Sequence, residues 1–562
     1  GRSREVERVT RREWVWAAAV AALTLALSSL PYAVGYLAQP PDRSFIGAVY
    51  DWEDTYSHLA KMQQGVRGDW EYRILFTPEE HPGAYINTFY IALGHLSRTL
   101  GLPPLLVYHL ARLVCAVLLL ATVYGFIGVF IPADRGGYGG SPLRRVAYLL
   151  ACLSSGLGWL VLLLTRSYTL GGITPTDFWF IEMYTFFTVL TFPHTCLAQA
   201  LHLLAFAAGV RLLREQGRRL DWPGAALAGL TLAVIHPYVL LPLYASLGLY
   251  ALVHRLRHRA PPWRRLAGLL GLALLPLPVV AYSYQAISSN PVFSAWQAQS
   301  YTLSPPPVHY LLGYGVVLAL AIWGGVRVVW EWAEPEMALV VWTLVVAPLL
   351  YAPLVFHLQR RMIDGLHVPL AILAALGLTQ GLLPAVRRSR LAGWLARRGY
   401  PRPRLVALTG WLVVAFSTPS TWYLLASLIL AAAGGYGPLY HSRAEVEAVH
   451  WLGEHSSPSD TVLCSYEICG YIPARIGQRT FWGHWAESIH LPQKQAAAQA
   501  FYSDLVTFDR AGMLAHYNIV YVFHGPREQR MGNFDPATAP YLKAAFQQDG
   551  VAIYRVLSEE TP

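Results

Sequence analysis

Charged residues are scarce in this 562-residue sequence: Asp, Glu, Lys and Arg together make up 14% of it, whereas hydrophobic residues make up 54%. Such a chain has more apolar surface than one soluble core can bury. Much of that surface falls in runs long enough to cross a bilayer, which takes about 20 residues each. The composition excludes an ordinary soluble protein and predicts a polytopic membrane protein with α-helical spans.

The sequence also lacks the short motifs of several enzyme classes. It has no nucleophile elbow, Walker loop, GxGxxG unit or cysteine zinc motif. Its five cysteines are too few for a disulfide framework. Cys115, Cys152 and Cys196 lie in apolar stretches and are interpreted as core residues, whereas Cys464 and Cys469 can pair only if the backbone geometry allows it.

The net charge of +10 does not predict nucleic-acid binding. The arginines sit in short clusters between the apolar runs, where topology signals belong, and no recognition module accompanies them. We therefore expect no nucleic-acid partner.

The basic clusters orient the chain. The first apolar run ends near Tyr36, is interpreted as an uncleaved signal anchor, and follows Arg2, Arg4, Arg8, Arg11 and Arg12. The positive-inside rule keeps those arginines in the cytoplasm, so the next segment lies outside. Continuing in this way predicts eleven spans: this first run, 104–131, 146–165, 195–212, a pair of short spans between residues 222 and 253, 266–285, 308–328, 336–356, 367–384 and 405–433.

The pair of short spans follows from an unusual length. About 32 largely apolar residues separate two basic clusters, too many for one ordinary span and just enough for two short ones. "IHPY" lies at the middle, which puts His236 and Pro237 at the outer turn.

From about residue 440 the composition becomes that of a soluble module. "TVLCSY", "NIVYVFHG" and "VAIYRV" are short β-rich runs between helical stretches. We predict a transmembrane domain over residues 1–433, with an acidic first outer loop over 38–86, and an extracytoplasmic α/β domain over 434–562. Residues 87–101 suit an interfacial helix.

The acidic outer loop is the first candidate site. In "DWEDTYSHLAKMQQG", residues 51–65, three carboxylates crowd into four positions: Asp51, Glu53 and Asp54. Trp52 and Tyr56 interleave with them, and the segment continues at helical spacing, so the acids are expected to begin a helix. A carboxylate here can act as a general base, two can hold a divalent cation, and the alternative is a set of solvated loop charges.

Arg360 and Arg361 form the second candidate site. They lie between apolar runs on the predicted outer side, against the positive-inside bias, which implies an anionic partner there. The guanidinium fork suits phosphate. The alternative is a pair that extends to lipid headgroups.

Histidines supply further candidates. His194 and His236 lie at predicted outer helix ends and His367 follows the arginine pair, so each can hydrogen-bond a substrate or serve the structure. His81 has Glu79 and Glu80 beside it, but no metal-binding spacing supports an ion, and we predict no metal site from this trio. His484 in "FWGHWAES" can contact an acceptor or cap the core of its domain.

The whole arrangement resembles the GT-C superfamily of membrane glycosyltransferases, those that use polyprenyl-phosphate sugars and are similar to glycosyltransferase family 39. The resemblance rests on the cytoplasmic N-terminus, the acidic first outer loop with its helix, the many spans and the C-terminal α/β domain. It implies that an acidic residue of the first loop is the base or a metal ligand, with Asp51 and Asp54 first and Glu53 next. It also implies that Arg360 and Arg361 hold the lipid phosphate.

The expected function is transfer of a sugar from a polyprenyl-phosphate donor to an acceptor outside a bacterial or archaeal plasma membrane. The remaining candidate substrate-binding residues are Tyr56, His81, His194, His236 and His367. The expected partners are membrane lipid, the lipid-linked donor and an unknown acceptor; the cofactor is unknown, with a divalent cation at the acidic loop as one option. The alternatives are a noncatalytic membrane subunit and a transporter of lipid or sugar.

Overall fold

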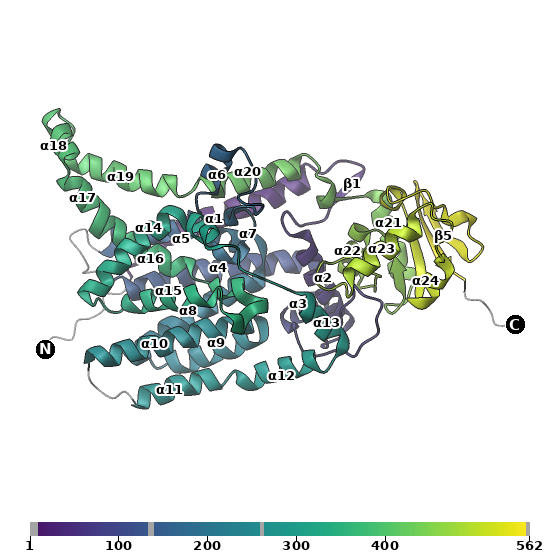
Figure 1. The fold of residues 1–562 in the computed structure, drawn as a ribbon, viewed down its shortest axis with the longest axis horizontal. Helices are drawn as coiled ribbons and strands as arrows, with labels where there is room; N and C mark the ends of the chain where they lie inside the picture. Colours follow the sequence, from purple (N-terminus) through teal and green to yellow (C-terminus); the bar gives the residue numbers. More distant parts are fainter. Residues whose placement is uncertain (1–8, 133–139, 259–262, 558–562) are drawn as a thin grey trace. The chain divides into compact units, whose positions relative to one another are not determined.

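The computed structural model describes residues 9–132, 140–258 and 263–557, most of which are helical (Figure 1). The chain divides into two compact units. Unit 1 comprises Gly1–Leu30, Arg112–Val280 and Thr302–Ser427, and unit 2 comprises Pro31–Ala111, Ala281–Tyr301 and Leu428–Pro562. The topology signals predicted at Arg2, Arg4 and Arg8 lie outside the described residues.

Unit 1 is helical, and long apolar segments supply its helices. They are the first part of α1 (Arg11–Leu37), most of α4 (Pro104–Phe130), α5 (Gly140–Leu153), α6 (Gly158–Thr165), α7 (Thr185–Thr191), α8 (Pro193–Leu213), α9 (Asp221–Ile235), α10 (Leu240–His258), α11 (Trp263–Leu274), the start of α12 (Leu277–Ser288), α14 (Pro307–Glu331), α15 (Met337–Leu349), α16 (His367–Leu376), α17 (Leu383–Arg388), α18 (Arg390–Arg397), α19 (Arg402–Phe416) and the first half of α20 (Pro419–Ala433).

The helical membrane architecture is confirmed. Among the described residues, seven helices are long and apolar enough to cross a membrane, or nine if two bent helix pairs each form one span. Two shorter apolar helices, α9 and α15, fall where two more of the eleven predicted spans lie. The count of eleven stays a prediction.

A sharp break divides the long apolar stretch of unit 1 at "IHPY". Helix α9 ends at Ile235, and His236 is its C-cap residue with a non-helical φ of −148°. A single 3-10 turn, η3 (Pro237–Val239), leads into α10. Proline lacks a backbone N–H, so it suits the start of the second helix.

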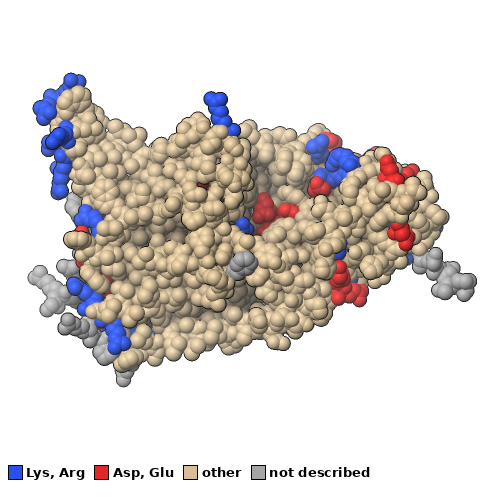
Figure 2. All heavy atoms as spheres, viewed as in Figure 1, with Lys and Arg blue, Asp and Glu red and all other residues tan. Residues whose placement is uncertain are grey.

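Basic side chains gather at another part of unit 1. Lys and Arg residues cover the surface over α17 and α18, whereas most of the remaining surface in view is uncharged (Figure 2). The arginines in these two helices are Arg387, Arg388, Arg390 and Arg397. They lie between the predicted spans 367–384 and 405–433, in a basic cluster that the positive-inside rule assigns to the cytoplasmic side.

In unit 2, two helices pack with their backbones in close contact. They are α2 (Trp52–Arg67) and α3 (Thr88–Leu100). A Cβ atom on Gly65 would lie 2.1 Å from the Ile91 carbonyl oxygen, and one on Gly94 would lie 2.0 Å from that of Met62. Only glycine fits either position, so the C-terminal half of α2 packs directly on the backbone of α3.

A four-stranded sheet forms the C-terminal part of unit 2. Its order is β3 (Thr461–Leu463), β4 (Ile519–His524), β6 (Val551–Val556) and β5 (Leu542–Gln548). The β3–β4 pair is parallel, and the other two pairs are antiparallel. The accompanying helices are α21 (Arg443–His455), α22 (Tyr466–Ile476), α23 (Leu491–Tyr502) and α24 (Arg510–His516).

A second, two-stranded sheet joins distant parts of unit 2. Strand β1 (Arg43–Phe45) pairs antiparallel with β2 (Tyr440–Ser442), and Phe45 lies opposite Tyr440. Strand β1 comes just before the acidic residues, and β2 comes just before α21. The loop that carries the carboxylates is therefore fixed to the C-terminal region at its base.

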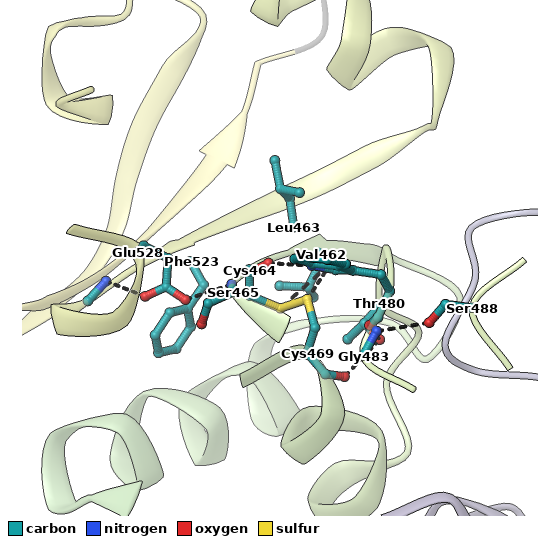
Figure 3. Close-up of a disulfide and its surroundings, with 12 residues drawn as sticks. Val462, Leu463, Cys464, Ser465, Cys469, Thr480, Gly483, Ser488, Phe523 and Glu528 are labelled. Atoms are coloured by element: carbon teal, nitrogen blue, oxygen red, sulfur yellow. Dashed lines mark hydrogen bonds between the residues drawn. A yellow bond between two sulfur atoms is a disulfide. The ribbon is translucent and has the colours of Figure 1, made fainter. Parts of the chain in front are cut away.

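A disulfide joins Cys464, which follows β3, to Cys469 in α22 (Figure 3). Their Cα atoms are 5.4 Å apart, within the range that a disulfide bridges. The other three cysteines are free and buried, as predicted for core residues. The geometry thus meets the condition that the sequence left open for the pair.

Candidate functional site

The acidic segment opens helix α2. Asp51 is the N-cap residue, and its side chain accepts a hydrogen bond from the backbone N–H of Asp54 at 3.4 Å. The free N–H groups at a helix start favour negative charge. Asp51 has a φ of 47°, which is uncommon for a residue with a side chain. The prediction that the acids begin a helix is confirmed.

Asp54 is oriented by two side chains from the C-terminal region of unit 2. His484 Nε2 lies 3.0 Å from Asp54 Oδ1, and Trp485 Nε1 donates to the same oxygen at 3.4 Å. The backbone N–H groups of Ala486 and Glu487 both donate to His484 Nδ1 at 3.1 Å. That nitrogen is therefore the acceptor, and the ring hydrogen on Nε2 is donated to Asp54.

His484 and Asp54 differ in their exposure to solvent. The His484 side chain is 4% exposed, whereas that of Asp54 is 26% exposed. The histidine is thus fixed in the interior, and the carboxylate that it holds is still open to solvent. Asp54 receives two N–H donors, the setting in which an ionised carboxylate acts as acceptor.

Asp51 has a different environment. Burial and the neighbouring charge of Asp54 raise the pKa of Asp51 to about 8. Burial also raises the pKa of Glu53, whose carboxylate accepts a hydrogen bond from the Tyr466 hydroxyl. Adjacent carboxylates in unequal environments divide acid and base roles between them.

The raised pKa of Asp51 predicts a pH-dependent stability. The folded protein keeps a proton on Asp51 that the unfolded chain loses above an ordinary pKa of 3.8, so this group contributes stability at low pH and loses it as pH rises toward 8. When the pH is raised from about 5 to about 9, we expect the melting temperature of Asp51→Asn to fall less than that of the parent protein. Asparagine keeps the helix cap without a charge. Thermal melting in detergent measures this. Asp69→Asn, an exposed aspartate just past the end of α2, is the control, and equal pH profiles for parent and Asp51→Asn would contradict the expectation.

A buried ionic network lies next to the Asp54 site. Glu487 accepts hydrogen bonds from Ser57 Oγ at 2.6 Å and from Lys61 Nζ at 2.8 Å. Burial alone would raise the pKa of Glu487, but the Lys61 ammonium and the other partners lower it to about 2. The network joins α2 to the segment that carries His484, so it holds the histidine opposite Asp54.

Two further predicted residues of unit 2 have internal partners. The Tyr56 hydroxyl lies 3.0 Å from His441 Nε2, and the Tyr56 side chain is buried. His81 Nε2 accepts from the Ile74 backbone N–H at 3.0 Å, and His81 Nδ1 lies 2.9 Å from the Glu79 carbonyl oxygen. Backbone groups therefore engage both ring nitrogens of His81. A substrate-binding role for either residue stays a prediction.

The arginine pair lies in η4 (Pro353–Ile363), a 3-10 segment of unit 1. The guanidinium of Arg360 stacks 4.9 Å from the ring centroid of Trp179 and 5.6 Å from that of Phe180. Arg361 forms an ion pair with Glu182. The two neighbouring arginines thus differ: aromatic faces support one, and a carboxylate neutralises the other.

Histidines surround this segment. His236 Nδ1 lies 3.2 Å from Asp364 Oδ2, and both side chains are buried. The His194 and His236 rings meet edge to face at 4.9 Å. Asp364 directly follows η4, which we call the arginine segment. The structure therefore brings His194 and His236 to the end of this segment.

His367 has a separate set of partners. Its Nδ1 accepts from the Thr185 backbone N–H at 3.3 Å, and its Nε2 lies 3.1 Å from Ser154 Oγ. The side chain is buried. Ser154 directly follows α5 and Thr185 begins α7, so these contacts favour a role of His367 in joining helices.

Sequence reasoning missed several members of these sites. It did not predict Trp485, Tyr466 or Glu487 beside the acids, nor Trp179 beneath Arg360. One usable signal was the i, i+4 spacing of Ser57 and Lys61 on α2, which puts two polar groups on one helix face. Nothing local in the sequence identifies Glu487 as their partner.

No family model and no curated protein matches the sequence. Among solved structures, the chain is similar to ArnT from Cupriavidus metallidurans bound to undecaprenyl phosphate, with a TM-score of 0.51 and 13% identity over 98% of this chain and 99% of that one. It is also similar to the arabinofuranosyltransferase AftD from Mycobacteria, with a TM-score of 0.51 and 16% identity over 99% of this chain.

The two similarities differ in coverage of the other protein. The match to ArnT takes in nearly that whole chain, whereas the match to AftD takes in 40% of it. At these identities the agreement concerns the fold. The fold of this chain is similar to the folds of ArnT and AftD, in agreement with the resemblance of the sequence to the GT-C superfamily.

Proposed function

We propose that this chain is an integral membrane glycosyltransferase that moves a sugar from a polyprenyl-phosphate donor to an acceptor hydroxyl on the extracytoplasmic face. The observation that carries the proposal is the hydrogen bonding of Asp54, which two N–H donors orient at the start of α2. The fold supports the same reading, since the similar ArnT structure contains undecaprenyl phosphate.

Asp54 is the proposed general base. It is 26% exposed and His484 fixes its direction, whereas the Asp51 side chain caps the helix and retains a proton near neutral pH. In the reaction, Asp54 takes the proton of the acceptor hydroxyl. The acceptor oxygen then bonds to the anomeric carbon, and the bond from that carbon to the phosphate oxygen breaks with its electron pair staying on the phosphate.

Arg360 and Arg361 are the proposed phosphate ligands. Negative charge grows on the departing phosphate, and fixed guanidinium groups stabilise it more than they stabilise the bound donor. Trp179 and Phe180 hold the Arg360 guanidinium in place before the donor arrives. Arg361 forms its ion pair with Glu182 beside the same segment.

A divalent cation at the acidic loop is a second reading of the same residues. Carboxylate oxygens are ligands that Mg²⁺ and Mn²⁺ accept, and two of the three acids Asp51, Glu53 and Asp54 would supply them. Chelation of the purified protein distinguishes the two. Transfer that is lost on chelation and restored by either ion supports a bound cation, whereas unchanged transfer supports the base alone.

The extracytoplasmic placement predicts a labelling pattern. Disulfides persist in oxidising compartments, so the Cys464–Cys469 bridge fits residues 434–562 outside the membrane. A cysteine introduced at Ser459 should react with an impermeant maleimide added to intact cells, whereas one at Arg218 should react only after lysis. Labelling of Arg218→Cys in intact cells would overturn the predicted topology.

Reconstitution tests the function itself. Purified protein in proteoliposomes with a radiolabelled polyprenyl-phosphate sugar and a membrane extract as acceptor source should release polyprenyl phosphate as the label reaches a new product. A transporter would move the lipid or sugar without breaking its bond to phosphate. A noncatalytic subunit would leave the donor intact.

A further inference from the structure

Two histidines and a glutamate meet at one end of helix α10 in unit 1. His254 and His258 lie one turn apart at the C-terminal end of the helix, and Glu334 lies in the turn between α14 and α15. His254 Nδ1 is 3.1 Å from Glu334 Oε1, and His258 Nε2 is 3.6 Å from Glu334 Oε2. Over the described ranges, this is the one place where three His, Cys, Asp or Glu ligand atoms all lie within 4.8 Å of one another.

These distances suit a metal ion. Zinc binds imidazole nitrogen and carboxylate oxygen at about 2.0–2.2 Å, so the ligand atoms of a tetrahedral site lie roughly 3.3 Å apart. The two measured separations, 3.1 and 3.6 Å, are close to that value. Histidines at i and i+4 present their rings on one helix face, the spacing of many zinc sites.

Arg214 lies beside the carboxylate of this cluster. The two imidazole rings are 4.3 Å apart, and Arg214 Nε lies 3.6 Å from Glu334 Oε2. Neutral imidazole is the form that ligates metals.

The other basic groups of this helix end are held elsewhere. Arg255 stacks over Trp263 at 5.3 Å, and Arg257 stacks over Trp332 at 5.7 Å. Both guanidinium groups are thus engaged on indole rings.

We propose that His254, His258 and Glu334 bind a divalent transition-metal ion, with zinc as the best match. Two imidazoles and one carboxylate disfavour Mg²⁺ and Ca²⁺, which prefer all-oxygen sites. Three protein ligands leave a fourth position for water. Arg214 then serves as the outer partner that orients the carboxylate.

The ion fastens one end of α10 to the α14–α15 turn. Helix α10 has 19 residues, which at about 1.5 Å each separate its ends by roughly 28 Å. His236, which hydrogen-bonds Asp364 next to the arginine segment, precedes the opposite end of the helix. The ion would therefore have a structural role, at the end of α10 that lies away from the arginine segment η4.

Metal analysis of the full-length protein tests this inference. The protein should be purified on a tag without histidine, stripped of metal with a chelator and dialysed against Zn²⁺. Inductively coupled plasma mass spectrometry then gives the amount of zinc per chain. We expect about one zinc per chain for the parent and less than about 0.2 for His254→Ala, His258→Ala and Glu334→Gln, because loss of a ligand exceeds the 10- to 100-fold weakening caused by loss of an outer partner.

An exposed ligand and a control variant separate loss of the metal from loss of the fold. His258 is 51% exposed, so its substitution removes a ligand with little disturbance of the fold. His450→Ala is the matched control, because His450 and Glu454 form an exposed i, i+4 pair with no third ligand among the described residues, and this variant should retain the metal.

Cobalt provides an independent readout. Co²⁺ added to the stripped parent protein should give the visible absorption of a four-coordinate site, and His258→Ala should not. A parent protein that binds no zinc, or a folded His258→Ala protein that binds as much as the parent, would overturn the inference. Neither readout depends on glycosyl transfer.

Discussion

Asp54→Asn should transfer sugar about 100- to 10,000-fold more slowly than the parent protein, the usual cost of losing a general base. Asparagine has nearly the same shape and can still accept the hydrogen bonds from His484 and Trp485, so the fold and donor binding should be retained. The loss should therefore appear in kcat, with little change in donor affinity.

Control variants separate this effect from general damage. Asp69→Asn changes an exposed aspartate at the other end of α2 and should keep full turnover. Asp51→Asn should have a smaller effect than Asp54→Asn, because it preserves the helix cap and removes a group that is protonated near neutral pH. If Asp54→Asn turns over normally, Asp54 is only a solvated charge, and the transferase proposal loses its main support.

Arg360→Lys should weaken the use of donor by roughly 10- to 100-fold, the equivalent of one or two lost hydrogen bonds to a charged group. Lysine keeps the charge but replaces the planar fork with a point donor, and it loses the flat stacking on Trp179 and Phe180. We expect a higher KM for donor and a lower kcat, measured with purified protein in proteoliposomes. Arg166→Lys, an exposed arginine at the end of α6, is the control.

Arg361 needs a paired design. Removing it alone leaves the nearly buried Glu182 carboxylate without its ion pair, a change that typically costs several kcal/mol of stability. The double variant Arg361→Ala with Glu182→Gln removes both charges. If the double variant and Arg360→Lys both fold and both use the donor normally, the two arginines contact ordinary lipid headgroups.

Local sequence patterns predicted what local physics controls. Apolar runs indicated the helical membrane part, "IHPY" indicated the break at His236, and the spacing after Asp51 indicated the helix α2. Each of these depends on residues a few positions apart. The GT-C resemblance rested on the acidic first outer loop with its helix, the many spans and the C-terminal α/β region, and the fold agrees with it.

Contacts between distant residues were beyond that reasoning. His484 reaches Asp54 across 430 positions, and Glu487 reaches Lys61 across 426. Periodicity shows which face of a helix is polar, but not which partner will meet it. The unequal settings of Arg360 and Arg361, identical neighbours in the sequence, likewise depend on the tertiary positions of Trp179 and Glu182.

A cryo-electron microscopy map of the protein with added polyprenyl phosphate tests the proposed donor most directly. We expect density for the phosphate against the Arg360 guanidinium, above the Trp179 ring, in the parent protein, and loss of that density in Arg360→Ala under the same conditions. Polyprenyl phosphate bound elsewhere, with Arg360 in contact only with bulk lipid, would contradict the proposal that this segment holds the donor.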